Sequence, residues 1–253
     1  MRAANFLLVA HGTRKQRGVS LIGDLAGQVS DAVGRPVRVA FVDVLGPTPR
    51  ELLGATLDQP TVLVPAFLAR GYHVSDDIPA HVQASGHRDV TSTRALGPDP
   101  QLIRVLVDRL VESGWRPEDS VLLAAAGTSD PAAMRDLHTT ATWLSATIGS
   151  RVELAFAATG EPKVADAVLS MRARSGGKRV VVASYLLSEG LFQDRLRDSG
   201  ADLVTDPLGT HSGVTRLIAS RFLRAGVPTR LPAELALQQG ITRTSPAGLP
   251  FRQ

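Results

Sequence analysis

Short apolar runs alternate along the chain with stretches in which apolar residues recur at helical spacing. The runs are short, uninterrupted and rich in branched residues, as is typical of strands buried on both faces. They cover residues 6–10, 37–42, 61–68 and, more weakly, 90–95. The helical stretches between and after them cover residues 21–33, 49–57 and 101–111. This alternation predicts an α/β fold built on a mainly parallel sheet.

The same pattern begins again in the second half of the chain. Four segments match four earlier ones in the same order, at separations of 112 to 119 residues. The matching pairs are residues 6–18 with 121–133, 37–53 with 152–168, 61–73 with 180–192, and 96–110 with 208–222. Four ordered matches indicate an internal duplication.

The repeat predicts two similar domains, each a four-stranded, mainly parallel sheet flanked by helices. The first domain is expected over residues 1–115 and the second over residues 118–225, with the joint in the Gly- and Pro-containing stretch 113–119. Residues 226–253 are rich in proline and glycine and are expected to be a tail, partly ordered at best.

The two copies keep the buried strand and the Gly-Thr turn but differ in three side chains that can coordinate or exchange protons. The pairs are His11 and Ala126, Asp43 and Ala158, and His73 and Phe192. Each lies at or just past the end of a predicted parallel strand, which is the edge where open α/β sheets bind ligands. Two imidazoles and a carboxylate suit a divalent metal of borderline softness, and they suit general base chemistry equally well. We therefore expect a functional site in the first half and an erased one in the second.

The amino-acid composition excludes several kinds of site and of cellular location. The chain has 253 residues and no cysteine, which excludes disulfides, iron–sulfur ligation and thiol catalysis. The apolar run 6–10 is too short for a signal peptide core or a membrane span, so we expect a soluble, cytoplasmic protein with no membrane partner. His81 and His87 lie in a polar stretch and are expected at the surface.

The formal net charge of +4 favours an anionic partner, but the cations are scattered and only 4% of residues are aromatic. Basic stripes and stacking platforms are missing, so nucleic acid is not expected. The turn after His11 leads into a predicted helix N-terminus, which favours an anion. The candidate substrate-binding residues are Gly12, Thr13, Arg14, Lys15, Arg70 and Gly71.

The segments "VAHGT", "AFVD...P" and "LARGYHVSDDIP" resemble the sirohydrochlorin chelatases, also called class II chelatases. The resemblance covers the first half, and the second half is similar to the degenerate repeat of two-domain members. It implies a lyase that inserts Fe²⁺ or Co²⁺ into sirohydrochlorin, a polyanionic tetrapyrrole, without ATP and with no permanently bound cofactor. The product would enter siroheme or cobalamin biosynthesis. Iron is favoured, because the histidine-rich segment and cysteine motif of some cobalt-inserting relatives are absent.

By the same resemblance, His11 and His73 would bind the metal and accept pyrrole protons, and Asp43 would assist as the third metal ligand and catalytic residue. The family usually has glutamate there, one methylene longer, so a water-bridged or base role for Asp43 stays open.

Two alternatives remain. A non-catalytic carrier of tetrapyrrole or metal would use the same residues without catalysed insertion. A histidine-dependent phosphatase also places histidine before glycine, but here Ala10 stands where that class has its phosphate-binding arginine. The chain could be a monomer, if the duplication replaces a dimer of half-length relatives, or a homodimer.

Overall fold

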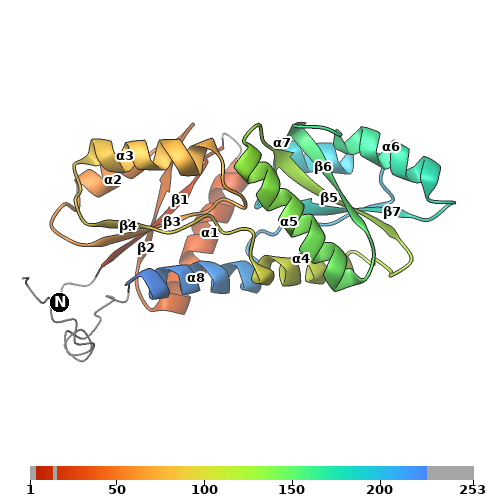
Figure 1. The fold of residues 1–253 in the computed structure, drawn as a ribbon. Helices are drawn as coiled ribbons and strands as arrows, with labels where there is room; N and C mark the ends of the chain where they lie inside the picture. The colour runs from red at the N-terminus through yellow and green to blue at the C-terminus, as the bar shows by residue number, and fades with distance from the viewer. Residues whose placement is uncertain (1–3, 14–15, 227–253) are drawn as a thin grey trace, which may run out of the picture.

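The computed structural model describes residues 4–13 and 16–226 and contains two parallel, four-stranded sheets (Figure 1). The strand order is β2-β1-β3-β4 in the first sheet and β6-β5-β7-β8 in the second. The elements of the first half are β1 (Asn5–Ala10), α1 (Gln16–Val33), β2 (Val37–Phe41), α2 (Pro49–Gly54), β3 (Thr61–Pro65), a π-helix η1 (His73–Asp77), α3 (Ile78–Ser85), β4 (Val90–Ser92) and α4 (Pro100–Glu112). Those of the second half are β5 (Ser120–Gly127), α5 (Pro131–Ile148), β6 (Val152–Thr159), α6 (Val164–Arg174), β7 (Val180–Tyr185), α7 (Leu191–Arg197), β8 (Leu203–Val204) and α8 (Ser212–Gly226).

The register of the strands repeats between the two sheets. Phe6 of β1 pairs with Val37 on one side and with Val62 on the other. Val121 of β5 is flanked in the same way by β6 and β7. Both central strands are almost wholly buried, because helices cover both faces of each sheet. The predicted duplicated α/β fold is confirmed.

Individual elements differ from the prediction mainly at their ends. The fourth strand stops at Ser92, and α1 begins at Gln16, one turn before the apolar periodicity starts. His87, expected at the surface, is buried, and its ring nitrogens lie within hydrogen-bond distance of Gln59 O and Asp89 N. The polar neighbours of His87 are exposed, but its own ring fills the space beneath the start of β3. Residues 227–253, the expected tail, lie outside the described residues, as do Arg14 and Lys15.

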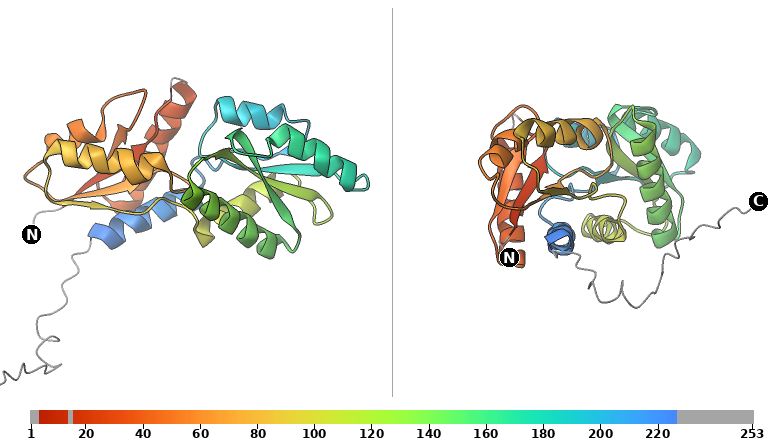
Figure 2. Two further views of the ribbon diagram at one scale, coloured as in Figure 1. Left: turned by 45° about the horizontal axis from the view of Figure 1, so that its top comes forward. Right: turned by 60° about the vertical axis from the view of Figure 1, so that its left-hand side comes forward.

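The last helix of each repeat packs against the sheet of the other repeat (Figures 1 and 2). Helix α8 lies along α1 and β3 of the first half, where the Phe222 ring stacks on Phe6 with 4.7 Å between ring centroids. Helix α4 packs against α5 and β7 of the second half. The largest hydrophobic core therefore runs without a break through both halves. Two smaller cores lie on the outer faces, under α2 and α3 and under α6 and α7.

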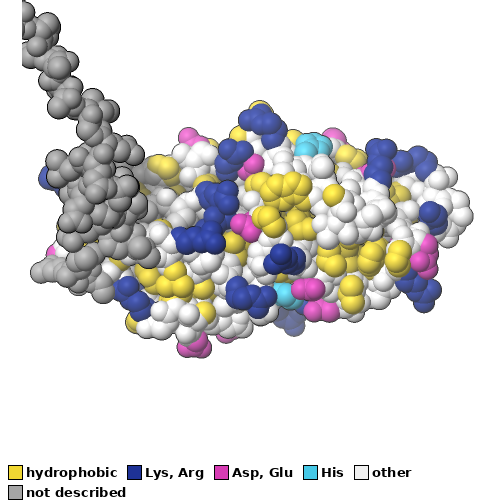
Figure 3. Space-filling model, turned by 60° about the horizontal axis from the view of Figure 1, so that its bottom comes forward, with side chains coloured by type: hydrophobic (Ala, Val, Ile, Leu, Met, Phe, Trp, Pro, Cys, Tyr) yellow, Lys and Arg dark blue, Asp and Glu magenta, His cyan; other side chains and the backbone are white. Residues whose placement is uncertain are grey.

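The face formed by α4 and α8 carries Arg side chains spread among apolar ones, with a few acidic residues between them (Figure 3). None of the helices in the described part of the chain is long and apolar enough to cross a lipid bilayer.

Because the core is shared, we expect Phe222→Ala to destabilise both halves together. Removing this buried ring should lower the free energy of unfolding by about 3–5 kcal/mol. Both tryptophans, Trp115 and Trp143, lie outside the sheet that Phe222 covers. In denaturant unfolding, tryptophan fluorescence and far-UV circular dichroism should both show a single transition. The midpoint of this transition should shift by the same amount in both signals. A fluorescence transition left unchanged while the dichroism signal splits in two would contradict the shared core.

Candidate active site

His11 is the first side chain released at the carboxyl end of β1. The backbone there is tied to the loop after β2, because the Asp43 N–H donates to the His11 carbonyl at 3.0 Å. Gly12 has a φ of +99°, and a Cβ at this position would lie 2.1 Å from the Asp43 carbonyl oxygen. Only glycine fits this approach. The structure thus gives Gly12 a backbone role, and a role in substrate binding stays a prediction.

His73 comes from a different element but lies against His11. It begins the π-turn η1, in which the Ile78 N–H donates to the His73 carbonyl. The two imidazole rings are 4.5 Å apart between centroids and nearly perpendicular, at 86°. The Phe67 ring stacks beside His73 at 5.9 Å. Two histidines separated by 62 positions therefore meet at one edge of the first sheet.

The hydrogen bonds of both rings leave the same nitrogen free. His11 Nδ1 lies 2.9 Å from the Gly12 carbonyl oxygen, and His73 Nδ1 lies 2.5 Å from the Asp77 carboxylate. A carbonyl and an ionised carboxylate only accept hydrogen bonds, so each Nδ1 carries a proton and donates. Nε2 of each ring then keeps its lone pair, which can bind a metal or take up a proton.

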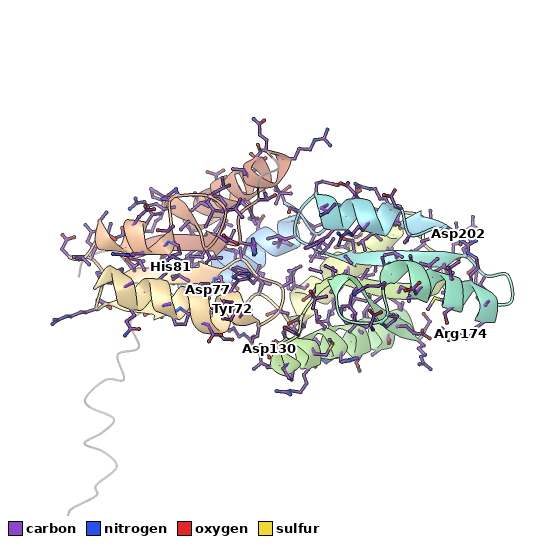
Figure 4. The ribbon with its side chains drawn as sticks, turned by 90° about the horizontal axis from the view of Figure 1, so that it is seen from above. Tyr72, Asp77, His81, Asp130, Arg174 and Asp202 are labelled. Atoms are coloured by element: carbon purple, nitrogen blue, oxygen red, sulfur yellow. The ribbon has the colours of Figure 1, made fainter. Side chains whose placement is uncertain are left out.

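Asp77 is the site residue that the sequence reasoning missed. Its i, i+4 spacing from His73 in "HVSDD" was the available signal, since residues four apart meet on a helix surface. Carboxylates that accept a hydrogen bond from a histidine orient the ring and raise its basicity. Figure 4 shows Tyr72 and Asp77 on the side of the first half that faces Asp130 of the second half.

The backbone of Asp43 is hydrogen-bonded to that of His11, but the Asp43 carboxylate does not form a ligand group with the two imidazoles. Its carboxylate accepts from the Val44 N–H at 2.7 Å, and its carbonyl accepts from the Leu45 N–H at 2.8 Å. Val44 between them has a φ of +68°, a strained conformation for a β-branched residue. Throughout residues 4–13 and 16–226, no three His, Asp or Glu side chains are grouped so as to hold a metal ion.

Both halves line a cleft of about 480 Å³ that opens onto His11 and His73. The first half contributes the segment 66–74 after β3, and the second half contributes the ends of β5 and β7 with Phe192. The carboxyl edges of the two sheets therefore face each other. Burial raises the pKa of the Tyr185 hydroxyl, which stays protonated and donates to the Leu68 carbonyl at 2.9 Å across the two halves.

The predicted substrate-binding residues have different surroundings. Arg70 and Gly71 line the cleft, but the Arg70 guanidinium donates to both carboxylate oxygens of Asp136 on α5, at 2.8 and 2.7 Å. Arg70 thus holds the halves together, and its contact with substrate stays a prediction. Thr13 follows the Gly12 turn, where its methyl group packs close to Gly18 of α1.

The corresponding edge of the second half holds no imidazole. Ala126 and Phe192 stand at the positions of His11 and His73. Near Ala158, the counterpart of Asp43, the Lys163 ammonium donates to the Ala158 and Gly160 carbonyls at 2.5 and 2.7 Å. The same ammonium also lies 3.3 Å from the Glu161 carboxylate, so an ion pair stands at this edge of the second half.

The fold and the paired imidazoles at facing sheet edges define a duplicated α/β protein of the chelatase-like fold. The chain belongs to the CbiX family, whose sequence model matches residues 5–113 and, separately, residues 120–225.

Several relatives support this assignment. A sirohydrochlorin ferrochelatase of Priestia megaterium is 28% identical over 232 residues, which cover 84% of this chain and 87% of that protein. A sirohydrochlorin cobaltochelatase of Methanothermobacter thermautotrophicus is 29% identical over 127 residues, or 41% of this chain and 88% of the relative. The structure of SirB from Bacillus subtilis with Fe³⁺ superimposes with a TM-score of 0.77 at 20% identity, covering 89% of this chain and 96% of SirB. The resemblance drawn from the residues is confirmed.

The pair of Arg70 and Asp136 yields a prediction on stability and pH. Burial raises the pKa of Asp136, but the hydrogen bonds from Arg70 outweigh burial and hold this pKa below its ordinary value. A lowered pKa in the folded state adds stability above the unfolded pKa of about 4, and this stability is lost as the pH falls through the folded value. Arg70→Met removes the guanidinium from a buried carboxylate, which keeps the hydrogen bond from the backbone N–H of residue 70. The variant should lower the free energy of unfolding by about 1–3 kcal/mol at pH 7.

The difference between wild type and Arg70→Met should shrink below about pH 4, where Asp136 is protonated in the variant. Urea unfolding at several pH values measures this difference in the free energy of unfolding. Arg197→Met is the matched control, because Arg197 binds the more exposed Glu189 in the same two-pronged way, and it should cost less than about 1 kcal/mol. If both variants lost the same free energy of unfolding at every pH, Arg70 would not stabilise the protein through Asp136.

Proposed function

We propose that this protein is a sirohydrochlorin chelatase that inserts a divalent metal, Fe²⁺ in preference to Co²⁺, without ATP. The observation that carries the proposal is the pair of imidazoles with free Nε2 atoms, 4.5 Å apart between ring centroids, at a cleft lined by both halves. Two relatives named as sirohydrochlorin chelatases, one for iron and one for cobalt, give the substrate class. Residues 1–115 would form the catalytic half, and residues 118–225 the degenerate half that walls the cleft.

The chemistry requires a weak metal site beside a base. Metal insertion exchanges one M²⁺ for two pyrrole N–H protons, so two protons must leave the ring as the metal enters it. His11 and His73 can hold the incoming metal through Nε2 and accept these protons once the metal has moved to the ring. Asp43, in the adjacent loop, would assist as a water-bridged ligand or base. An incomplete ligand set favours release of the metal to the macrocycle, since open coordination positions remain for the substrate.

We expect His11→Ala and His73→Ala each to slow metallation by about 10²-fold or more, because each removes a ligand and a proton acceptor. Anaerobic visible spectra of sirohydrochlorin with Fe²⁺, and separately with Co²⁺, measure the rate with and without protein. His138→Ala is the matched control, since His138 is an exposed histidine on α5. A spectral shift of bound sirohydrochlorin without faster metallation would identify a carrier. Hydrolysis of phosphate esters instead would identify a phosphatase.

Asp77→Asn should lower the metallation rate by about 10–100-fold while binding of sirohydrochlorin is unchanged. The amide keeps the size of the side chain but loses the charge that orients and polarises His73. Asp76→Asn is the control, because Asp76 is an exposed neighbour. If the two variants behave alike, Asp77 does not act through His73.

A further inference from the structure

Phe192 is an aromatic side chain held partly exposed in the wall of the cleft opposite the histidines. It is the second residue of α7, its relative exposure is 37%, and it lines the cleft together with His11 and His73. Its neighbours in the wall include Leu187, Ala126 and Leu137. An apolar ring left in contact with water in such a cleft provides a surface for a flat, apolar ligand face.

Arg195 lies one helical turn beyond Phe192 and is fixed over its ring. The guanidinium carbon is 5.7 Å from the ring centroid, and Nη1 donates to the Ala157 carbonyl at 3.1 Å. Both contacts orient the guanidinium without neutralising it.

The charge of Arg195 stands out against its neighbours. Arg197 on the same helix donates to both oxygens of Glu189, and Arg70 across the cleft does the same with Asp136. Arg195 has no ion pair with a carboxylate in residues 4–13 and 16–226. An oriented guanidinium without a carboxylate beside it is suited to bind a carboxylate from a ligand.

We propose that Phe192 and Arg195 together form the substrate contact of the second half. Phe192 packs against the flat face of the macrocycle, and Arg195 binds a carboxylate at its periphery. The inference rests on the proposed function, because a planar polycarboxylate is the class to which sirohydrochlorin belongs. In this half the position equivalent to a metal-binding histidine has become a substrate-binding aromatic residue.

The test measures binding apart from catalysis. Metal-free protein is titrated with sirohydrochlorin under anaerobic conditions at low and high salt, and the absorbance change gives Kd. Phe192→Ala and Arg195→Gln should each raise Kd about tenfold at low salt. The effect of Arg195→Gln should shrink at high salt, because screening weakens the charge contact that it removes. Phe192→Tyr keeps the aromatic face and should bind within about twofold of wild type.

The kinetic readout separates this role from that of the histidines. In the metallation assay, Phe192→Ala and Arg195→Gln should raise KM for sirohydrochlorin and leave kcat within about twofold, since the metal-binding nitrogens are untouched. Leu169→Ala and Arg104→Gln are the matched controls for apolar and charged surface, on α6 and α4. Both should match wild type, and circular dichroism should show that all variants are folded.

Each other result counts against the proposal. If Phe192→Ala and Arg195→Gln bind sirohydrochlorin like wild type while wild type metallates it, the contact is wrong and the chelatase function stands. A loss in kcat at unchanged Kd would also overturn it, because the two residues would then act on the chemistry. If wild type neither binds nor metallates sirohydrochlorin, the proposed function fails, and the contact fails with it.

Discussion

The exchange of the terminal helices is the constraint on which the rest of the structure depends. Helix α8 covers the sheet of the first half, and α4 packs on the sheet of the second, so each half is completed by the other. The apolar side chains of both helices belong to the same continuous core. Separating the halves would expose this core to water, at a cost of about 25 cal/mol for each Å² of apolar surface. The facing edges of the two sheets are held in place by this shared burial.

Polar contacts refine that arrangement at the cleft itself. The Tyr185 hydroxyl reaches the Leu68 carbonyl, and the Arg70 guanidinium reaches the buried Asp136. Both links join the segment after β3 to the second half, and this is the segment that leads into His73. The position of one of the two imidazoles therefore depends on contacts from the other half, which links the duplication directly to the site.

The two repeats share a backbone conformation at the sheet edge but carry different side chains on it. Both keep a glycine with positive φ after the central strand, at Gly12 and Gly127, and in both a Cβ would collide with a neighbouring carbonyl. The backbone requirement is thus the same, while the side chains around it differ. The first half has imidazoles with free Nε2 atoms, whereas the second has a lysine ammonium and an exposed aromatic ring. This asymmetry agrees with a proposal in which one half carries out the chemistry and the other holds the substrate.

The sequence by itself determined the parallel α/β class, the duplication, and the placement of His11 at the end of the first strand and of His73 in the segment after the third. These features are local or repeated, because buried parallel strands read as apolar runs and a duplicated register leaves matching segments. Only the tertiary structure decided that α4 and α8 exchange sheets, since an apolar helix stripe specifies that it is buried but not which sheet covers it. It also decided that the carboxylate of Asp77, rather than that of Asp43, hydrogen-bonds a histidine ring and that Arg70 binds Asp136. Side-chain partners of this kind depend on distances between segments far apart in the sequence, which periodicity does not encode.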